Sequence, residues 1–334
     1  MNTNKNIILV RGWDCSLQEY KEAWDDGRLL TAQIETSNLC DLMCEYCFRE
    51  ELGLPAKRRL PGEMTITETL QLIDQLADLG TKTINIIGAG EPTLDPGFEE
   101  IVHYISQYGI VPVVFTHGGT IDERLVDVLK DTNSSVIIKV NSFHAEVQDA
   151  LVGRKGYSAK RDRGLKLLLS AGFASPGIDS QGRPYHTCLG IDSVICQENK
   201  DDILDIFRYC RMHNIMPLIK TFIPAGRTKE RTDMEISLQE YIALARKVQE
   251  IDEKEFGIMY DRFVPYLGSV PCTQNGRASI YVTILGDIFE CPGQQHRYGN
   301  VKTVAVKETF AKIREEEKNF NFGCPPRIEY WRKK

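Results

Sequence analysis

Short apolar runs alternate with amphipathic stretches along most of the chain. The apolar runs have the length and composition of buried β-strands and lie at residues 29–35, 82–87, 110–116, 135–141, 187–196 and 216–223. Helical periodicity between and after them predicts helices at residues 66–79, 98–108, 122–130, 164–171, 200–212 and 237–251. Strand–helix units repeated in this way predict an α/β fold, in which a parallel sheet is covered by helices.

The segments outside this alternation are of three kinds. Residues 1–28 form a short N-terminal extension, in which the apolar run 7–10 predicts an edge strand. The turn-rich stretch 176–184 predicts a rim loop before the fifth strand. After residue 258 the alternation stops, and 279–291 predicts a β-hairpin with its turn at Gly286-Asp287.

Composition limits the partners and the cellular compartment that the sequence predicts. Its 334 residues are 42% hydrophobic and 26% charged, as in an ordinary globular protein, and its net charge of −6 argues against a nucleic-acid surface. No apolar run reaches the roughly 18 residues of a membrane span, and the N-terminus lacks the apolar core of a signal peptide. Ten cysteines without an export signal predict a reducing, cytoplasmic setting.

Three cysteines lie close together after the first predicted strand. Cys40, Cys44 and Cys47 form a C-x3-C-x2-C pattern, which can hold three irons of a cubic [4Fe–4S] cluster and leave the fourth iron open. Structural zinc normally has four protein ligands, but the next candidates, Cys15 and His103, are distant in sequence. A disulfide is disfavoured by the odd number of cysteines in the loop. The spacing therefore favours an open-site cluster over zinc.

The residues around this loop resemble the radical S-adenosylmethionine (SAM) superfamily. Tyr46 and Phe48 flank the last cysteine, as in that family, and Gly88-Ala89-Gly90-Glu91-Pro92 resembles its GGEP motif, with Ala89 in place of a glycine. The resemblance implies that this segment holds the methionyl amino group of SAM, with Tyr46 beside the cofactor. Glycines allow close approach of the backbone, and a carboxylate accepts hydrogen bonds from an ammonium group.

Two further strand ends resemble SAM contacts of the family with less specificity. Thr116-His117-Gly118-Gly119 occupies the place of a TNG-like turn, and Asn141 and Ser142 follow the fourth strand, where a polar residue commonly touches the SAM ribose. Thr116, Asn141 and Ser142 are therefore predicted SAM contacts, although each is equally well explained as a polar strand end. The family also implies a partial (β/α)6 TIM-like barrel with its motifs at the carboxyl ends of the strands.

The C-terminal cysteines suggest a second cluster. Cys272, Gly286 and Cys291 have the C-x13-G-x4-C spacing that resembles the opening of a SPASM/twitch extension. With only Cys324 in addition, we expect a small twitch-like β-hairpin/helix domain that holds one auxiliary [4Fe–4S] cluster. Its fourth ligand is left open between Cys188, Cys196, Cys210, another side chain and substrate; a zinc site or structural thiols are the alternatives. The predicted domains are an extension at 1–28, the barrel at 29–258 and the twitch-like domain at 259–334.

The family resemblance implies reductive cleavage of SAM to a 5′-deoxyadenosyl radical, which abstracts hydrogen from the substrate, with electrons from a partner such as flavodoxin or ferredoxin. We expect a small polar metabolite (a sugar, aminocyclitol or nucleoside) as substrate, because only 28 residues precede the barrel and the SPASM cysteine set is incomplete. The alternatives are crosslinking or epimerisation of a ribosomal peptide, and a non-catalytic iron–sulfur scaffold. Candidate pocket residues are His117, Lys220 and Arg227, with Cys188 as a weaker candidate for a hydrogen-atom donor.

Overall fold

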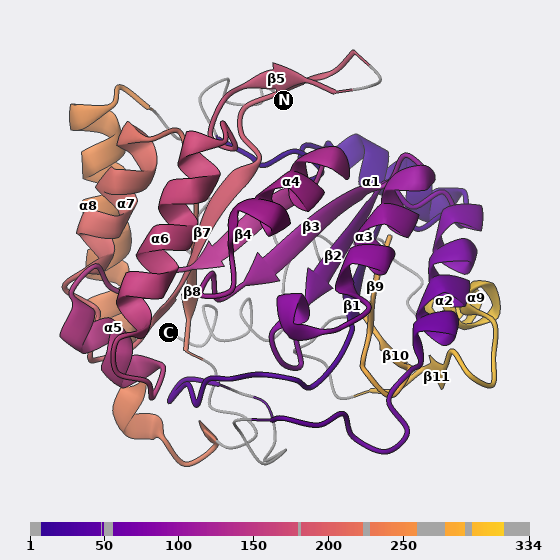
Figure 1. Cartoon of the computed structure of the whole chain (residues 1–334). Helices are drawn as coiled ribbons and strands as arrows, with labels where there is room; N and C mark the ends of the chain where they lie inside the picture. Colours follow the sequence, from indigo (N-terminus) through magenta and orange to yellow (C-terminus); the bar gives the residue numbers. More distant parts are fainter. Residues whose placement is uncertain are drawn as a thin grey trace.

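The computed structural model describes residues 8–47, 49, 56–179, 182–222, 228–258, 278–290 and 296–316. A nine-stranded sheet runs through the molecule in the order β11-β10-β9-β1-β2-β3-β4-β7-β8 (Figure 1). All six predicted strands form and pair in parallel, as β1 (Thr31–Glu35), β2 (Thr83–Ile87), β3 (Val111–Thr116), β4 (Ser135–Lys139), β7 (Leu189–Ile195) and β8 (Met216–Thr221). The predicted α/β fold of the partial-barrel type is confirmed.

The six predicted helices also form. They are α2 (Ile66–Asp78), α3 (Phe98–Gln107), α4 (Glu123–Asp131), α6 (Tyr157–Ser170), α7 (Ile203–Met212) and α8 (Leu238–Glu255). Capping boxes begin α2 and α8, in which Thr65 and Ser237 each exchange hydrogen bonds with a glutamate three residues later. The prediction missed α1 (Leu17–Asp25), α5 (Ala145–Leu151) and α9 (Val306–Glu316), and it began α6 at residue 164.

The C-terminal hairpin is present and extends the barrel sheet. β9 (Ser279–Val282) and β10 (Asp287–Phe289) are antiparallel, and Gly286 between them has φ 86°, which favours glycine. β9 also pairs in parallel with β1, while the short β11 (Gly299–Asn300) completes this edge. Residues 259–277 lie outside the described residues, so the predicted boundary at 258/259 stays a prediction.

The N-terminal segment crosses the amino ends of the strands. The predicted edge strand at 7–10 was wrong for its described part, since Val10 makes only an isolated bridge to Thr187. The backbone carbonyls of Arg11 and Gly12 accept hydrogen bonds from Ser135 Oγ and Thr83 Oγ1 at 2.8 and 2.7 Å. These contacts close the end of the barrel opposite the cysteine loop.

Two other segments complete the fold. The predicted rim loop at 176–184 contains a two-stranded ribbon of β5 (Gly177–Ile178) and β6 (Pro184–Tyr185). None of the described helices combines the length and the apolar character that crossing a bilayer requires.

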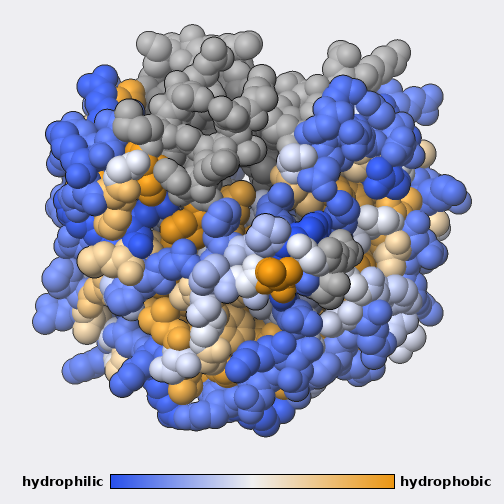
Figure 2. All heavy atoms as spheres, turned by 90° about the horizontal axis from the view of Figure 1, so that it is seen from above, coloured by the Kyte–Doolittle hydropathy of each residue, from blue (hydrophilic) through white to orange (hydrophobic). Residues whose placement is uncertain are grey.

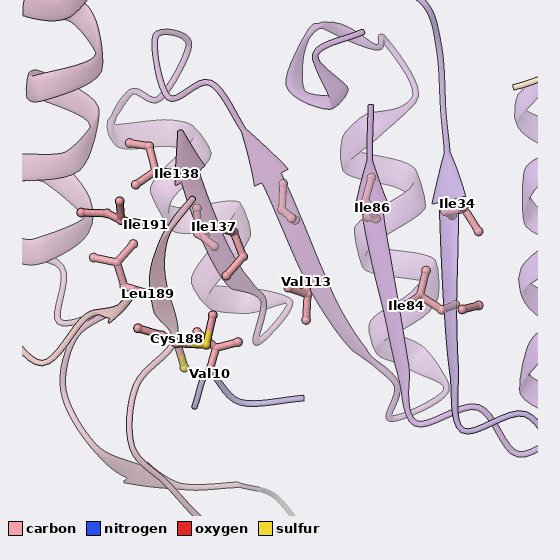
Figure 3. Close-up of a cluster of buried hydrophobic side chains, with 14 of the residues drawn as sticks. Val10, Ile34, Ile84, Ile86, Val113, Ile137, Ile138, Cys188, Leu189 and Ile191 are labelled. Carbon is pink, nitrogen blue, oxygen red and sulfur yellow. The ribbon is translucent and has the colours of Figure 1, made fainter. Parts of the chain in front are cut away.

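The two faces of the sheet differ in character. Ile34, Ile84, Ile86, Ile138 and Ile191 are fully buried and belong to the same hydrophobic core as the apolar faces of the helices (Figure 3). Side chains at the alternate positions face the barrel interior, where polar groups such as Gln33, Asn85, Lys139 and Asp192 lie among apolar ones such as Val113. On the face shown in Figure 2, hydrophilic residues predominate along the sides and the lower edge, and hydrophobic residues gather nearer the middle. The polar groups of the interior can bind the polar parts of a ligand.

Candidate functional site

The cysteine loop follows β1 and is held by the segment after α5. Met43 and Glu45 donate backbone hydrogen bonds to the carbonyls of Val152 (3.1 Å) and Leu151 (2.8 Å). Leu42 is buried against Val152 and Tyr157. These contacts fix the backbone on which the three thiols are carried.

The three thiols of this loop are available as ligands of a cluster. Cys40, Cys44 and Cys47 are free and partly exposed, and no three Cys, His, Asp or Glu side chains in the described ranges converge on one metal ion. In a cubic cluster each thiolate binds a different iron, so the thiols need not converge on one point. Burial raises the pKa of Cys44 to about 12 and also raises that of Cys40, so both are protonated at neutral pH until iron displaces the proton.

The segment Gly88-Ala89-Gly90-Glu91 is joined to the cysteine loop by the backbone. Gly90 N–H donates to Ser37 O at 3.0 Å and Glu91 N–H donates to Leu39 O at 2.6 Å. A Cβ on Gly90 would lie 2.1 Å from Leu39 O, and one on Gly88 would lie 1.6 Å from Gly90 O. Both glycines are therefore required sterically. Ala89 occupies the one position of the three at which this backbone accommodates a methyl group.

Glu91 ties the ends of β2 and β3 together. Its buried carboxylate accepts hydrogen bonds at Oε1 from the hydroxyls of Thr93 (2.6 Å) and Thr116 (2.7 Å), and at Oε2 from the backbone N–H of His117 (2.7 Å). Glu91 also caps the short 3-10 helix η1 (Pro92–Leu94). Thr116 thus positions Glu91, and contact of either residue with SAM stays a prediction.

His117 links this network back to the cysteine loop. Its Nδ1 accepts the N–H of Gly119 at 3.0 Å, so Nε2 carries the proton that faces Asp41 Oδ1 at 2.9 Å. The hydrogen bonds from His117 and Arg154, with the charge of Arg154, hold the pKa of Asp41 at about 2 despite partial burial. Burial alone would lower the pKa of His117, but the charges of Glu91 and Asp41 outweigh it and raise that pKa. Asp41, inside the C-x3-C spacing, is thereby anchored on two sides.

A groove of about 450 Å³ lies beside the cysteine loop. Its apolar lining comes from α5 and from Met234 in the 3-10 helix η3 (Thr232–Met234). Glu45, from the cysteine loop itself, pairs with Arg231 at 2.6 Å on the rim.

Comparison with known proteins decides the family. The radical SAM superfamily model matches residues 34–210, which include the cysteine loop, the Gly88–Glu91 segment and the strand ends that follow. The chain belongs to the radical SAM superfamily. As a member of this family it is an enzyme that uses a [4Fe–4S] cluster and SAM, and the prediction of both cofactors is confirmed.

Three similar proteins extend the comparison. The mycofactocin maturase MftC of Mycobacterium tuberculosis is 25% identical over 296 residues, which cover 85% of this chain and 70% of that protein. The antilisterial bacteriocin subtilosin biosynthesis protein AlbA of Bacillus subtilis is 30% identical over 146 residues, 43% of this chain and 31% of that protein. SuiB of Streptococcus suis, solved with the precursor peptide SuiA, shares the fold with a TM-score of 0.63 at 15% identity, over 88% of this chain and 68% of that chain.

The radical SAM fold brings most of the predicted site residues together. Asn141 and Ser142 are fully buried at the end of β4, where Asn141 Oδ1 accepts the N–H of Val194 at 2.9 Å and Ser142 Oγ donates to Asp202. Tyr46 is buried between Cys44 and Cys47, and its ring centre lies 5.6 Å from Lys139 Nζ. SAM contact of Tyr46, Asn141 and Ser142 remains a prediction.

Some predicted residues lie elsewhere. Cys188 directly precedes β7 at the amino end of the strand, beside Val10 (Figure 3). The cysteine loop instead follows β1 and so lies at the carboxyl ends of the strands. This location argues against Cys188 as a hydrogen-atom donor and as a ligand at the carboxyl end. Cys210 is a thiol of the main core, whereas Cys196, also buried, follows β7 at its carboxyl end and packs in one cluster with Tyr46 of the cysteine loop. Arg227, Cys272, Cys291 and Cys324 lie outside the described residues.

Sequence reasoning missed two anchors and one charged cluster. Asp41 and Arg154 escaped notice because a single acidic or basic residue in a loop carries no pattern. Lys139, Asp192 and Lys220 form the cluster on the inner face, and only Lys220 was named as a candidate. The available signal was a charged residue within or ending an apolar strand, which burial permits only when the charge is paired.

Proposed function

We propose that this radical SAM enzyme modifies a ribosomally made peptide, by crosslinking or epimerisation. Support comes from the similarity to MftC, a maturase, which spans 296 residues and so reaches well beyond the 34–210 core shared by the superfamily. The similarity to the bacteriocin biosynthesis protein AlbA adds to it. The comparisons favour this alternative over the expected small metabolite. That expectation relied in part on the small number of residues before the barrel, which says nothing about the substrate that the barrel holds.

The described residues fit the chemistry of such an enzyme. Cys40, Cys44 and Cys47 would hold the cluster, and SAM bound at its open iron supplies an oxidant able to remove hydrogen from an unactivated C–H bond. The protein must orient that bond and exclude water. Glu91, with Thr116 and His117, holds the adjoining loops in place, and the polar inner face and the groove at Glu45 offer surfaces for a substrate chain.

We also propose one auxiliary [4Fe–4S] cluster in the C-terminal segment, with a reductant such as flavodoxin or ferredoxin. Cys291 directly follows the described hairpin, whose strand β9 pairs with β1, and β1 leads into the cysteine loop. The described hairpin therefore lies next to the strand that leads into the cysteine loop. About eight irons per chain after anaerobic reconstitution would support this cluster, and about four would remove it.

The function is tested with the full chain, reconstituted anaerobically and given SAM, dithionite and any short peptide that is encoded beside its gene. Mass spectrometry should show hydrogen loss for a crosslink, or deuterium uptake from heavy water for epimerisation, together with 5′-deoxyadenosine. The control is the variant with Cys40, Cys44 and Cys47 changed to Ala. Turnover of a sugar or nucleoside without any peptide would contradict the proposal.

A further inference from the structure

Three charged side chains meet on the inner face of the sheet. Lys139 ends β4 and lies opposite Asp192 of β7 in the strand register, and Lys220 of β8 is beside Val194 on the same face. Lys139 Nζ donates to Asp192 Oδ2, and Lys220 Nζ lies 3.5 Å from Asp192 Oδ1. We call these three residues the inner cluster.

The inner cluster carries an excess of positive charge. Burial would raise the pKa of Asp192, but Lys139 and Lys220 outweigh burial and lower it, so the carboxylate stays ionised. Within the inner cluster, one carboxylate faces two ammonium groups, each of which has three N–H donors. The side chain of Asp192 is 5% exposed, while those of Lys139 and Lys220 are 20% and 36% exposed. The carboxylate is buried beneath cations that solvent can reach.

The inner cluster lies next to the predicted SAM site. Lys139 Nζ is 5.6 Å from the ring centre of Tyr46, inside the cysteine loop, and Lys220 Nζ is 4.9 Å from the ring centre of Phe115, next to Thr116. Both aromatic rings stabilise the ammonium groups through cation–π contacts. A group bound by the lysines would therefore be held within reach of the chemistry.

We propose that Lys139 and Lys220, held together by Asp192, bind an acidic group of the peptide substrate, either an Asp or Glu side chain or a C-terminal carboxylate. This inference rests on the proposed function and adds a specificity site to it. Ammonium groups bind carboxylates through charge-assisted hydrogen bonds, which are about twice as strong as neutral ones. Asp192 fixes the lysines in place before the substrate arrives.

The experiment uses the reconstituted full chain with SAM and two blocked glycine peptides that differ only in a central Glu or Gln. Binding measured by calorimetry should be about tenfold tighter for the Glu peptide, and Lys220→Met should abolish this preference while Lys220→Arg retains it. Asp192→Asn keeps an oxygen that accepts hydrogen bonds from the lysines and removes the competing negative charge, so it should preserve the preference. Lys200→Met, which removes a lysine that pairs with Glu240 outside the sheet, is the matched control and should change nothing.

Two results would overturn the inference. One is equal binding of both peptides to the unsubstituted protein, or an unchanged preference in Lys220→Met. The other is weaker SAM binding in Lys220→Met without loss of the Glu preference, which would assign the lysine to the SAM carboxylate. Failure of the proposed function gives a different result: no peptide is modified, yet the Glu preference persists in binding. Thermal melts and the cluster absorbance check that each variant is folded and loaded.

Discussion

At the scale of single residues, steric and electrostatic demands at a few positions shape the site. The three loop cysteines and Gly88 to Glu91 were predictable because spacing and close backbone approach leave a local pattern in sequence. His117, Asp41 and Arg154 act through contacts between residues up to 113 positions apart, so no local pattern reveals their association. Sequence motifs therefore predict the ligand residues of the site but not the residues that hold those ligands in position.

Gly90→Ala tests the steric argument. Its Cβ would lie 2.1 Å from Leu39 O, so the cysteine loop must move, at a cost of about 1–3 kcal/mol in unfolding free energy. Because the displaced loop carries the three cysteines, iron content after reconstitution should also fall. Ala89→Gly is the matched control, which costs at most about 1 kcal/mol through backbone entropy. Urea unfolding and iron analysis measure both effects, and normal iron loading of Gly90→Ala would contradict the close-approach explanation.

Lys139→Met tests the charge balance around Asp192. Because the folded-state pKa of Asp192 is lowered, its ionisation contributes stability above the unfolded pKa of about 3.9, and that contribution is lost as pH falls through the lower folded pKa. The Lys139→Met substitution removes part of the stability that ionised Asp192 contributes. The deficit in unfolding free energy of Lys139→Met should therefore be largest near neutral pH and shrink on acidification. Denaturant titrations over a pH series measure this, and a deficit independent of pH would refute it.

At the scale of elements, periodicity found the barrel strands and their helices because one continuous core selects apolar residues at regular positions. α5 was missed because it has only seven residues and packs against α6 at the rim. The parallel pairing of β9 with β1 joins residues nearly 250 positions apart in sequence, and hydrophobic pattern cannot indicate which edge a hairpin selects.

A buried ion pair between α7 and α8 gives an element-scale prediction. Arg211 Nε and Nη2 donate to the two carboxylate oxygens of Asp252 at 2.7 Å each, and both side chains are at most 1% exposed. Asp252→Ala should cost about 3–5 kcal/mol, because it leaves the guanidinium buried without its carboxylate. The double variant Arg211→Met with Asp252→Leu should recover most of this loss. Guanidinium unfolding of the single and double variants decides, and additive losses would disprove the charge-pair explanation.

At the scale of the whole molecule, one face of the sheet packs against the helices and stabilises the fold, and the other face carries the candidate site. The apolar outer face packs under the helices, and the inner face, which carries the charged cluster, lies between the N-terminal segment at one end and the cysteine loop at the other. The fold class followed from the sequence because parallel strands that are covered on both faces appear as short apolar runs between amphipathic helices. The substrate class did not, because the charges that face a substrate come from separate strands.

This separation predicts a local response to cluster loading. The strands of the barrel bond to one another and to the helical core, whereas the cysteine loop is held by Gly90, Glu91 and the residues after α5. Amide hydrogen exchange, compared between chelator-treated and reconstituted protein, should therefore change at 36–47, 88–91 and 151–157 and remain unchanged in β2 to β4. The variant with Cys40, Cys44 and Cys47 changed to Ala should match the chelated protein under both treatments. Protection lost throughout the strands on iron removal would instead show that the barrel depends on its cluster to fold.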